Sequence, residues 1–310
     1  MSPLELQIPT AGARTLGARC YEPVGRPIGQ VVIHGATATP QRYYGSFSRH
    51  LAWQGLRVLT YDYRGIGDSR VEPIAADPTC MRDWIDDAAA AQRWLVDRDP
   101  ALPLLAIGHS FGGQIAPALD AGRRPRAIVL VGAGSGYWRR YSGRARARLW
   151  LTWSGLVPAL ARGLGYMPGW TGIGEDVPGP VARQWARWCL HPEYFLGELP
   201  WLYDQLADYP GRVRALSFTD DEFLPEANAR WLLRRLRSAS VEHLRTSPAA
   251  VELPQIGHFG FFRATAADRL WSAAVAFLVA AARDQVVPQV VWRRPDLGEQ
   301  IMRDLEFGRA

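Results

Sequence analysis

The stretch PLLAIGHSFGGQIAPAL, residues 103–119, joins an apolar run to a glycine-rich turn and a second apolar segment. Residues 103–107 are short and apolar throughout, which predicts a strand buried on both faces of a sheet. Residues 114–119 predict the opening of a helix. Between them, Gly108-His109-Ser110-Phe111-Gly112 is a G-x-S-x-G pattern in a strand–turn–helix context, and this context predicts a nucleophile elbow.

The composition of this turn has a steric reason. A serine that attacks a carbonyl must project clear of its own backbone, so side chains at the flanking positions would collide. Glycines at positions 108 and 112 remove those side chains. The amide of Phe111, at the start of the new helix, would then point toward a developing oxyanion. An ordinary serine in a glycine-rich turn is the alternative that these five residues leave open.

Strands alternate with helices along most of the chain. Eight runs have strand character: residues 4–8, 17–21, 30–33, 56–61, 103–107, 127–132, 213–218 and, more weakly, 241–245. Four further segments predict helices: residues 41–54, 84–96 with Asp83 as N-cap, 225–236, and an amphipathic closing helix over 264–283. The alternation predicts an α/β fold with a mostly parallel eight-stranded sheet flanked by helices.

The alternation stops between residues 135 and 210. This segment is rich in tryptophan, proline and glycine, and residues 149–164 and 181–189 within it predict helices. We interpret 135–210 as a helical cap inserted into a core formed by residues 1–134 and 211–284. The sequence indicates no role for the tail, residues 285–310.

A serine hydroxyl needs a base beside it, and the base needs a group that orients it. After an elbow serine, the expected order is a carboxylate at a later strand end and then a histidine in a loop. Asp221, four residues before Pro225, has the place of the acid, although helix capping is an alternative role and Asp220 an alternative acid. His258 is the only downstream histidine in a glycine-flanked loop, and a plain surface-loop histidine is the alternative.

A tetrahedral oxyanion needs a second hydrogen-bond donor besides the Phe111 amide. The amide of Ala36, after His34-Gly35 at the end of a predicted central strand, has the expected place. Thr37 could add its hydroxyl. A simple turn from strand to loop is the alternative for this segment.

These motifs together resemble the α/β-hydrolase superfamily. His34-Gly35, the loop at residues 62–69, the elbow around Ser110, Asp221 and His258 are most similar to its serine-aminopeptidase and monoacylglycerol-lipase-like branch. The resemblance covers residues 31–134 and 213–283 but not the cap or the tail. In this superfamily dehalogenases and epoxide hydrolases use an aspartate nucleophile, so a serine at position 110 implies acyl chemistry.

The cap carries two features that bear on the substrate. Trp138, Trp150 and Trp153 could bind an acyl chain or an aromatic acid, or they could form the cap's own small core. A cluster of arginines could receive a phosphate or carboxylate, as in a coenzyme A thioester, or form a solvated helix face: Arg139, Arg140, Arg144, Arg146 and Arg148.

Composition restricts the possible partners. The net charge of +6 comes from arginine alone, and no nucleic-acid-binding motif accompanies it, so we expect no nucleic-acid partner. Cys20, Cys80 and Cys189 are widely spaced, which is typical of free thiols in a reducing cytoplasm and not of a zinc site. We see no secretion signal, and no apolar stretch approaches membrane-spanning length, residues 273–282 being too short. We expect a cytoplasmic protein without metal or organic cofactor.

Residues and resemblance together predict a serine hydrolase that cleaves a small-molecule carboxylic ester, in the manner of a carboxylesterase or lipase. Ser110 attacks the carbonyl, His258 moves the proton, and Asp221 holds the imidazole tautomer. A thioester, amide or peptide substrate is also open, since the same triad serves each. Two other functions remain: an acyltransferase that uses the same acyl-enzyme, and a ligand-binding protein that has the fold without turnover.

Overall fold

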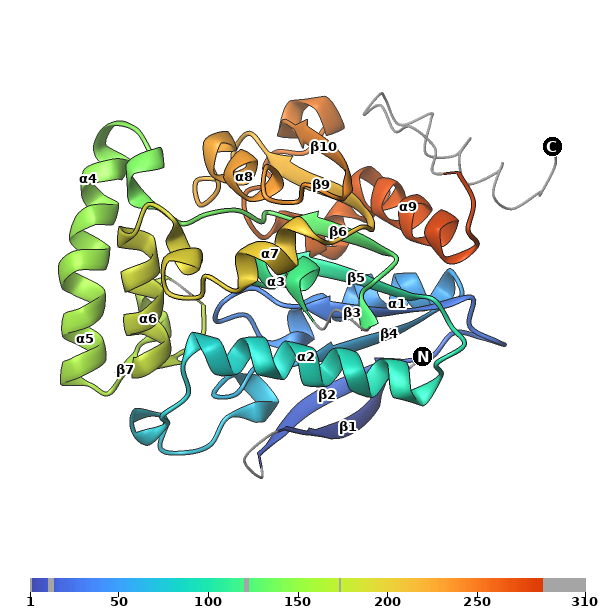
Figure 1. The fold of residues 1–310 in the computed structure, drawn as a ribbon, viewed down its shortest axis with the longest axis horizontal. Coiled ribbons are helices and arrows are strands. Elements are labelled where there is room, and N and C mark those ends of the chain that lie inside the picture. Colours follow the sequence, from blue (N-terminus) through green and yellow to red (C-terminus); the bar gives the residue numbers. More distant parts are fainter. Residues whose placement is uncertain (1, 11–13, 120–122, 173, 287–310) are drawn as a thin grey trace.

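The computed structural model describes residues 2–10, 14–119, 123–172 and 174–286. Its centre is an eight-stranded sheet in the order β1-β2-β4-β3-β5-β6-β9-β10 (Figure 1). The strands are β1 (Leu4–Pro9), β2 (Thr15–Tyr21), β3 (Gly29–His34), β4 (Leu56–Tyr61), β5 (Leu104–His109), β6 (Ala127–Val131), β9 (Arg212–Phe218) and β10 (Ser240–Thr246). The weak strand predicted over 241–245 is therefore a full edge strand.

Most of the sheet is parallel. Strand β2 pairs antiparallel with β1 and with β4, whereas all other neighbouring strands pair in parallel. This arrangement confirms the predicted fold class. Because Ser110, Gly132 and Thr219 directly follow the neighbouring strands β5, β6 and β9, they meet at the carboxyl edge of the sheet, where open α/β folds bind their ligands.

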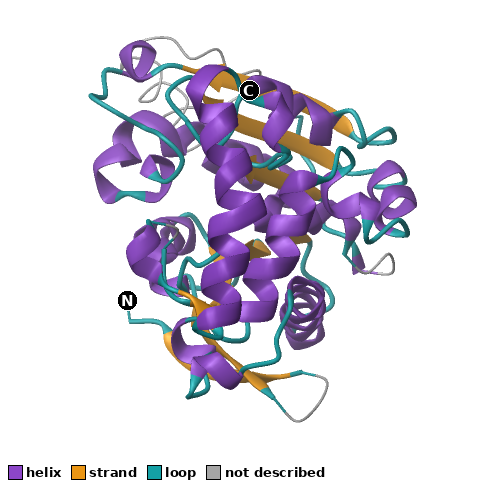
Figure 2. Ribbon diagram, turned by 90° about the vertical axis from the view of Figure 1, so that its left-hand side faces the viewer, coloured by secondary structure: helices purple, strands orange, loops and turns teal. Residues whose placement is uncertain are grey.

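Helices cover both faces of the sheet, as Figures 1 and 2 show. On one face, α1 (Gly45–Trp53) and α9 (Ser272–Ala282) pack in one apolar cluster with the strands. On the other face, α2 (Met81–Arg98), α3 (Phe111–Ile115) and α8 (Glu226–Leu233) pack in a second cluster. The second cluster continues into the cap, so cap and core share one apolar interior on this side.

The closing helix differs from its prediction. Every residue from Ala273 to Ala281 is buried, so α9 has no polar face and is not amphipathic. Together with the helical turns that precede it, α9 forms a continuous helical stretch of 19 residues, Ala264–Ala282, with a mean hydropathy of 1.3. This length and composition would suit a membrane span. The expectation that no stretch approaches this length is therefore corrected. Since 67% of the window is buried inside the fold, its apolar character is that of a core helix.

Helix α2 begins earlier than predicted, with Cys80 as its N-cap. Asp83, predicted as the N-cap, instead lies in the first turn and accepts a hydrogen bond from the Cys80 amide at 2.8 Å. This is the reciprocal half of a capping box, in which a carboxylate three residues inside the helix satisfies the capping residue's own N–H.

The segment predicted as a cap, residues 135–210, lies between β6 and β9. Its elements are α4 (Gly143–Leu151), α5 (Val157–Gly163), β7 (Tyr166–Met167), β8 (Val177–Pro178), α6 (Gly179–Leu190) and α7 (Leu202–Ala207). A π-helical turn over Thr152–Leu156 joins α4 to α5, so the helix predicted over 149–164 is one continuous helical stretch that begins earlier. Helices α4 to α6 lie beyond the carboxyl ends of the central strands (Figure 1) and in front of them in Figure 2.

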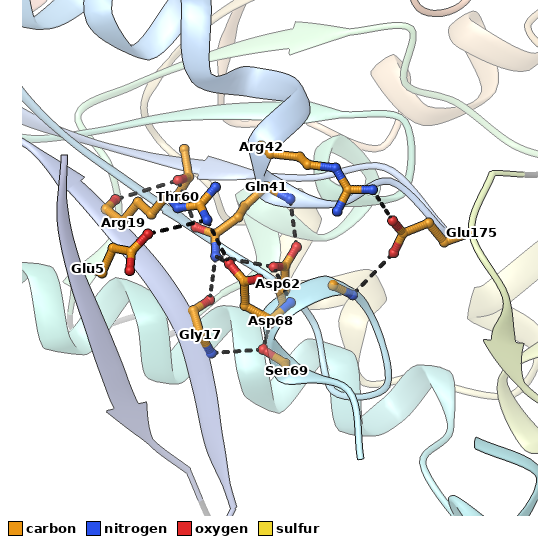
Figure 3. A network of polar contacts seen from close by, with 11 residues as sticks. Glu5, Gly17, Arg19, Gln41, Arg42, Thr60, Asp62, Asp68, Ser69 and Glu175 are labelled. Carbon is orange, nitrogen blue, oxygen red and sulfur yellow. Dashed lines mark hydrogen bonds and ion pairs between the residues drawn. The ribbon is translucent and has the colours of Figure 1, made fainter. Parts of the chain in front are cut away.

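The glycine-containing loop at residues 62–69 is held by a network of hydrogen bonds, shown in Figure 3. Asp62, directly after β4, accepts hydrogen bonds from the Gln41 amide at 2.6 Å and the Asp68 amide at 2.9 Å. Ser69 Oγ donates to the Asp62 carbonyl and accepts from the Gly17 amide of β2. Burial raises the pKa of Asp62 to about 6, although its N–H partners favour the charged form.

One residue of the cap also takes part in this hydrogen-bond network. Glu175 accepts a hydrogen bond from the Gly67 amide at 3.2 Å and pairs with Arg42, as Figure 3 shows. The Glu175 amide in turn donates to the Ala38 carbonyl at 2.8 Å. These bonds fix the edge of the cap to the loop that follows His34-Gly35, and hence to the floor of the site described next.

Candidate active site

Ser110 lies at a sharp turn between β5 and α3. Its dihedrals, φ 50° and ψ −112°, belong to a region that a residue with a side chain occupies only under constraint. The constraint comes from the neighbouring backbone: the Ser110 amide donates to the Val131 carbonyl, and its own carbonyl accepts from Gly113 and Gln114. The hydroxyl is half-buried and makes no hydrogen bond to any residue that the structure describes. This is the geometry of a nucleophile elbow.

The elbow needs glycine for the steric reason that the sequence suggests. A Cβ atom added at Gly108 would lie 2.4 Å from the Gly113 Cα, and one at Gly112 would lie 2.1 Å from the His34 carbonyl oxygen. Both distances are far below van der Waals contact. Gly112 thus allows the elbow to approach the end of β3, where its amide donates to the Gly35 carbonyl.

The structure brings His258 and Asp221 together. His258 Nδ1 lies 2.7 Å from Asp221 Oδ2, and both side chains are buried. The other carboxylate oxygen of Asp221 accepts hydrogen bonds from the amides of Phe223 and Leu224, at 2.8 and 3.0 Å. The acid therefore presents one fixed oxygen to the imidazole. His258 Nε2 makes no hydrogen bond to a described residue, and His258 lines the same cavity as Ser110.

Asp220 has a different place from Asp221. Its Oδ2 accepts hydrogen bonds from the amides of Ile256 and Gly257, at 2.8 and 2.9 Å. Asp220 thus anchors the loop that carries His258, and it does not contact the imidazole. Of the two acids between which the sequence leaves the choice open, Asp221 therefore contacts the imidazole ring and Asp220 contacts the loop.

Gly132, at the end of β6, is a site residue that sequence reasoning missed. It has φ 59°, and a Cβ atom there would lie 3.2 Å from His258 Cε1 and 3.6 Å from Asp221 Oδ2. The glycine therefore leaves the space in which the histidine–aspartate pair sits. Its position next to a strand end gave a weak signal, but its neighbours Asp221 and His258 lie 89 and 126 residues away in the sequence.

A buried chain of hydrogen bonds runs behind the site. The Ala36 amide donates to Tyr44 Oη at 2.8 Å, Tyr44 Oη lies 3.0 Å from His109 Nδ1, and His109 Nε2 lies 3.0 Å from the His258 carbonyl. A carbonyl only accepts, so Nε2 carries the proton and Nδ1 accepts from the tyrosine hydroxyl. Burial lowers the pKa of His109 well below its usual value, which keeps this ring neutral. The chain links the loop after β3 to the loop of His258.

This chain changes the expectation for the oxyanion hole. The Ala36 amide, predicted as a donor, is engaged by Tyr44 and is not free to bind an oxyanion in this structure. The amides of Phe111 and Thr37 make no hydrogen bond to any described residue, and Thr37 lines the same cavity as Ser110. Thr37, considered in the sequence for its hydroxyl, thus offers a main-chain donor instead.

We expect Tyr44→Phe to lower both stability and activity. Removal of the hydroxyl leaves the Ala36 amide and His109 Nδ1 buried without a partner, which costs about 1–3 kcal/mol of unfolding free energy for each lost partner. Without this link, the loop after β3 and the loop of His258 should be held less precisely, which should lower kcat/KM for an ester about tenfold. Chemical denaturation and ester hydrolysis measure the two effects. An increase in kcat/KM would show that the freed Ala36 amide is itself the oxyanion donor.

A cavity of about 940 Å³ lies over Ser110 between the sheet edge and the cap. Ser110, Asp221 and His258 all line it. Much of its cap wall is apolar, with Leu149, Leu156, Met167 and the tryptophans Trp153 and Trp185. The two indole rings lie 4.7 Å apart, centroid to centroid. This size and lining suit a small organic ligand.

Only one of the three tryptophans predicted to bind substrate lines the cavity. Trp153 lines the cavity, whereas Trp138 and Trp150 do not; they pack on each other outside it, with ring centroids 6.5 Å apart. The other tryptophan in the cavity wall is Trp185, which no sequence pattern singled out. A helical period shows which residues share a face, but it does not show which face turns inward.

The predicted arginine cluster likewise has some members in the cavity wall and others outside it. Arg140, Arg144 and Arg148 line the cavity, and Arg139 and Arg146 lie over the Trp138 ring at 5.2 and 5.3 Å. The cysteines Cys20, Cys80 and Cys189 are free thiols. Among the described residues, no three His, Cys, Asp or Glu side chains form a group that could hold a metal ion.

Comparison with known proteins places these features in a family context. Residues 27–168 match the family described as serine aminopeptidase, S33. Human monoglyceride lipase is 31% identical over 127 residues, which are 39% of this chain and 40% of that protein. The lysophosphatidylserine lipase ABHD12 of Danio rerio is 36% identical over 81 residues, 24% of this chain and 20% of that protein. The matched stretches thus span two fifths or less of either relative.

Solved structures agree on the fold. An esterase from Exiguobacterium antarcticum superposes with a TM-score of 0.58 at 16% identity, covering 90% of this chain and 100% of that chain. A putative hydrolase from Agrobacterium vitis S4 gives a TM-score of 0.58 at 17% identity, covering 88% and 97%. At this level of identity the likeness concerns the fold.

Proposed function

Since this chain is an α/β-hydrolase of the serine-aminopeptidase and monoglyceride-lipase-like branch, we propose that it is a serine hydrolase of small carboxylic esters. The observation that carries the proposal is the joint presence, in one cavity, of a strained elbow serine and a buried histidine–aspartate pair. The lipases among its relatives also favour an acyl ester.

In the proposed reaction, Ser110 Oγ attacks the ester carbonyl while His258 Nε2 takes its proton. Asp221 holds the ring so that Nδ1 carries a proton and Nε2 is basic, and it stabilises the imidazolium that forms. His258 then returns the proton to the departing alcohol, and the acyl group remains on Ser110. Water, activated by the same histidine, releases the acid.

The oxyanion of each tetrahedral intermediate would be bound by main-chain donors. We assign the Phe111 and Thr37 amides to this task, because one lies at the elbow and the other in the loop after β3, and neither makes a hydrogen bond to a described residue. Such donors act strongly where they are fixed in advance and shielded from water. The Glu175 contacts to Gly67 and Ala38 would hold the Thr37 loop in place.

Labelling with a fluorophosphonate probe tests the proposal. We expect one adduct per wild-type chain, mapped by mass spectrometry to the peptide that contains Ser110, because only an activated hydroxyl reacts. His258→Ala should lose the label, and the control His50→Ala, on α1, should keep it. A folded wild-type protein without label, or an adduct on another serine, would contradict the proposal.

The acceptor of the acyl group needs a separate measurement. An acyltransferase would use the same acyl-enzyme, and the residues that line the cavity, four arginines among them, do not distinguish water from another nucleophile. Hydrolysis in the presence of a competing alcohol gives the ratio of free acid to transferred ester. We expect free acid to dominate; predominant transfer would assign the chain to the acyltransferases.

We also propose that the protein is cytoplasmic, as the sequence predicts.

A further inference from the structure

The cavity over Ser110 has an excess of positive charge. The charged side chains in its wall are Arg140, Arg144, Arg148, Arg245, Asp221 and Glu222. Asp221 is already paired with His258. A cleft with one dominant sign of charge concentrates ligands of the opposite sign.

Two of these arginines have structural partners. Arg140 donates to Ser135 Oγ at 3.0 Å and to the Pro192 carbonyl at 3.1 Å. Arg245 donates to Ser217 Oγ at 3.2 Å and lies 3.9 Å from the Glu226 carboxylate. Both guanidinium groups are thus held by the fold itself.

Arg144 and Arg148 differ from these two. They lie four positions apart on α4, so they share one face of the helix about 6 Å from each other along its axis. Both line the cavity, and neither guanidinium group makes an ion pair or hydrogen bond with any residue in the described part of the chain. Arg146, between them, lies over Trp138 on another side of the helix. The helix thus presents two uncommitted guanidinium groups to the cavity.

We propose that Arg144 and Arg148 form an anion-binding subsite, so that the ester substrate carries a carboxylate or phosphate group away from its scissile bond. This inference rests on the proposed hydrolase function and specifies its substrate class. Guanidinium groups match the geometry of these two anions, with paired N–H donors for paired oxygens. The apolar wall around Trp153 and Leu149 would receive the uncharged body of the same molecule.

Matched ester pairs test the subsite. One pair places the charge on the acyl side, mono-4-nitrophenyl adipate against 4-nitrophenyl hexanoate. The other places it on the alcohol side, 1-hexanoylglycerol 3-phosphate against 1-hexanoylglycerol. We expect the wild type to favour the anionic member of at least one pair by tenfold or more in kcat/KM. The double variant Arg144→Gln/Arg148→Gln should lose this preference and keep its kcat/KM for the neutral esters within about twofold.

The control is Arg146→Gln, which removes the same charge from the same helix outside the cavity and should keep the preference. Equal rates on both members of both pairs, or a preference that survives the double variant, would overturn the subsite. So would a double variant whose only change is lost binding to phosphatidylserine vesicles, because the arginines would then belong to a membrane surface.

A binding measurement separates this proposal from the hydrolase proposal. Calorimetric titration of Ser110→Ala with adipate and with glycerol 3-phosphate needs no turnover. We expect binding of at least one anion that weakens tenfold or more when Arg144 and Arg148 are also replaced by Gln. Absence of binding would overturn the subsite even for an active hydrolase, whereas binding without esterase activity would overturn the function and keep the subsite.

Discussion

Ser110→Ala should lower kcat for any ester that the wild type hydrolyses by about four to six orders of magnitude. In the proposed mechanism no other group can form the acyl bond, so only the background rate from substrate binding and oxyanion stabilisation remains. Steady-state hydrolysis of a 4-nitrophenyl ester, with purified wild type and variant side by side, measures the loss.

The melting temperature of this variant should stay within a few degrees of the wild type. The Ser110 hydroxyl makes no hydrogen bond to any described residue, so its removal leaves no buried partner unsatisfied. The strained backbone conformation is unchanged, because alanine meets the same steric limits at φ 50° as serine does. A folding defect would mean that the hydroxyl has a structural role that this structure does not show.

Ser142→Ala is the matched control. Ser142 lines the same cavity and precedes α4, and its side chain makes no capping hydrogen bond. Its loss should change kcat less than tenfold. Activity of Ser110→Ala within tenfold of the wild type would place the nucleophile elsewhere.

The elbow shows what local sequence can predict. Its apolar strand, its glycines and its serine are contiguous, so the steric requirement is written within a few residues. Strand β4 occupies Leu56–Tyr61, the predicted residues 56–61, for a similar reason: a mostly apolar run bounded by a glycine and a polar loop limits where the strand can begin and end. The order of serine, acid and histidine then follows from the topology of the fold.

The rest of the site depends on contacts between distant segments. The hydroxyl of Tyr44 takes up the Ala36 amide, and no local pattern shows that these two meet across a buried turn. Gly132 matters because the histidine–aspartate pair fills the space beside it. The side of α4 that lines the cavity is equally undetermined by the sequence, since arginines at 144, 146 and 148 alternate around the helix and nothing local tells which of them border the cavity.

Asp221→Asn should lower kcat about 10⁴-fold near neutral pH, while Asp220→Asn should lower it less than tenfold. The two variants remove the same charge from adjacent residues of one loop. Asparagine at 221 can still accept from the amides of Phe223 and Leu224 through its oxygen, but its NH₂ group then faces His258 Nδ1. That donor favours the tautomer with the proton on Nε2, which cannot take the proton of Ser110.

Asparagine at 220 has no such effect on the ring. The Asp220 oxygen that accepts from Ile256 and Gly257 can be replaced by the amide oxygen, so the loop keeps its anchor. Each amide bond to a carboxylate is exchanged for a weaker neutral one, which should cost about 1–2 kcal/mol of unfolding free energy and little catalysis. Kinetics and chemical denaturation of both variants therefore separate two roles: Asp221 should affect the rate and Asp220 mainly the stability. The reverse pattern would make Asp220 the acid of the triad and would require a different arrangement of the His258 loop during turnover.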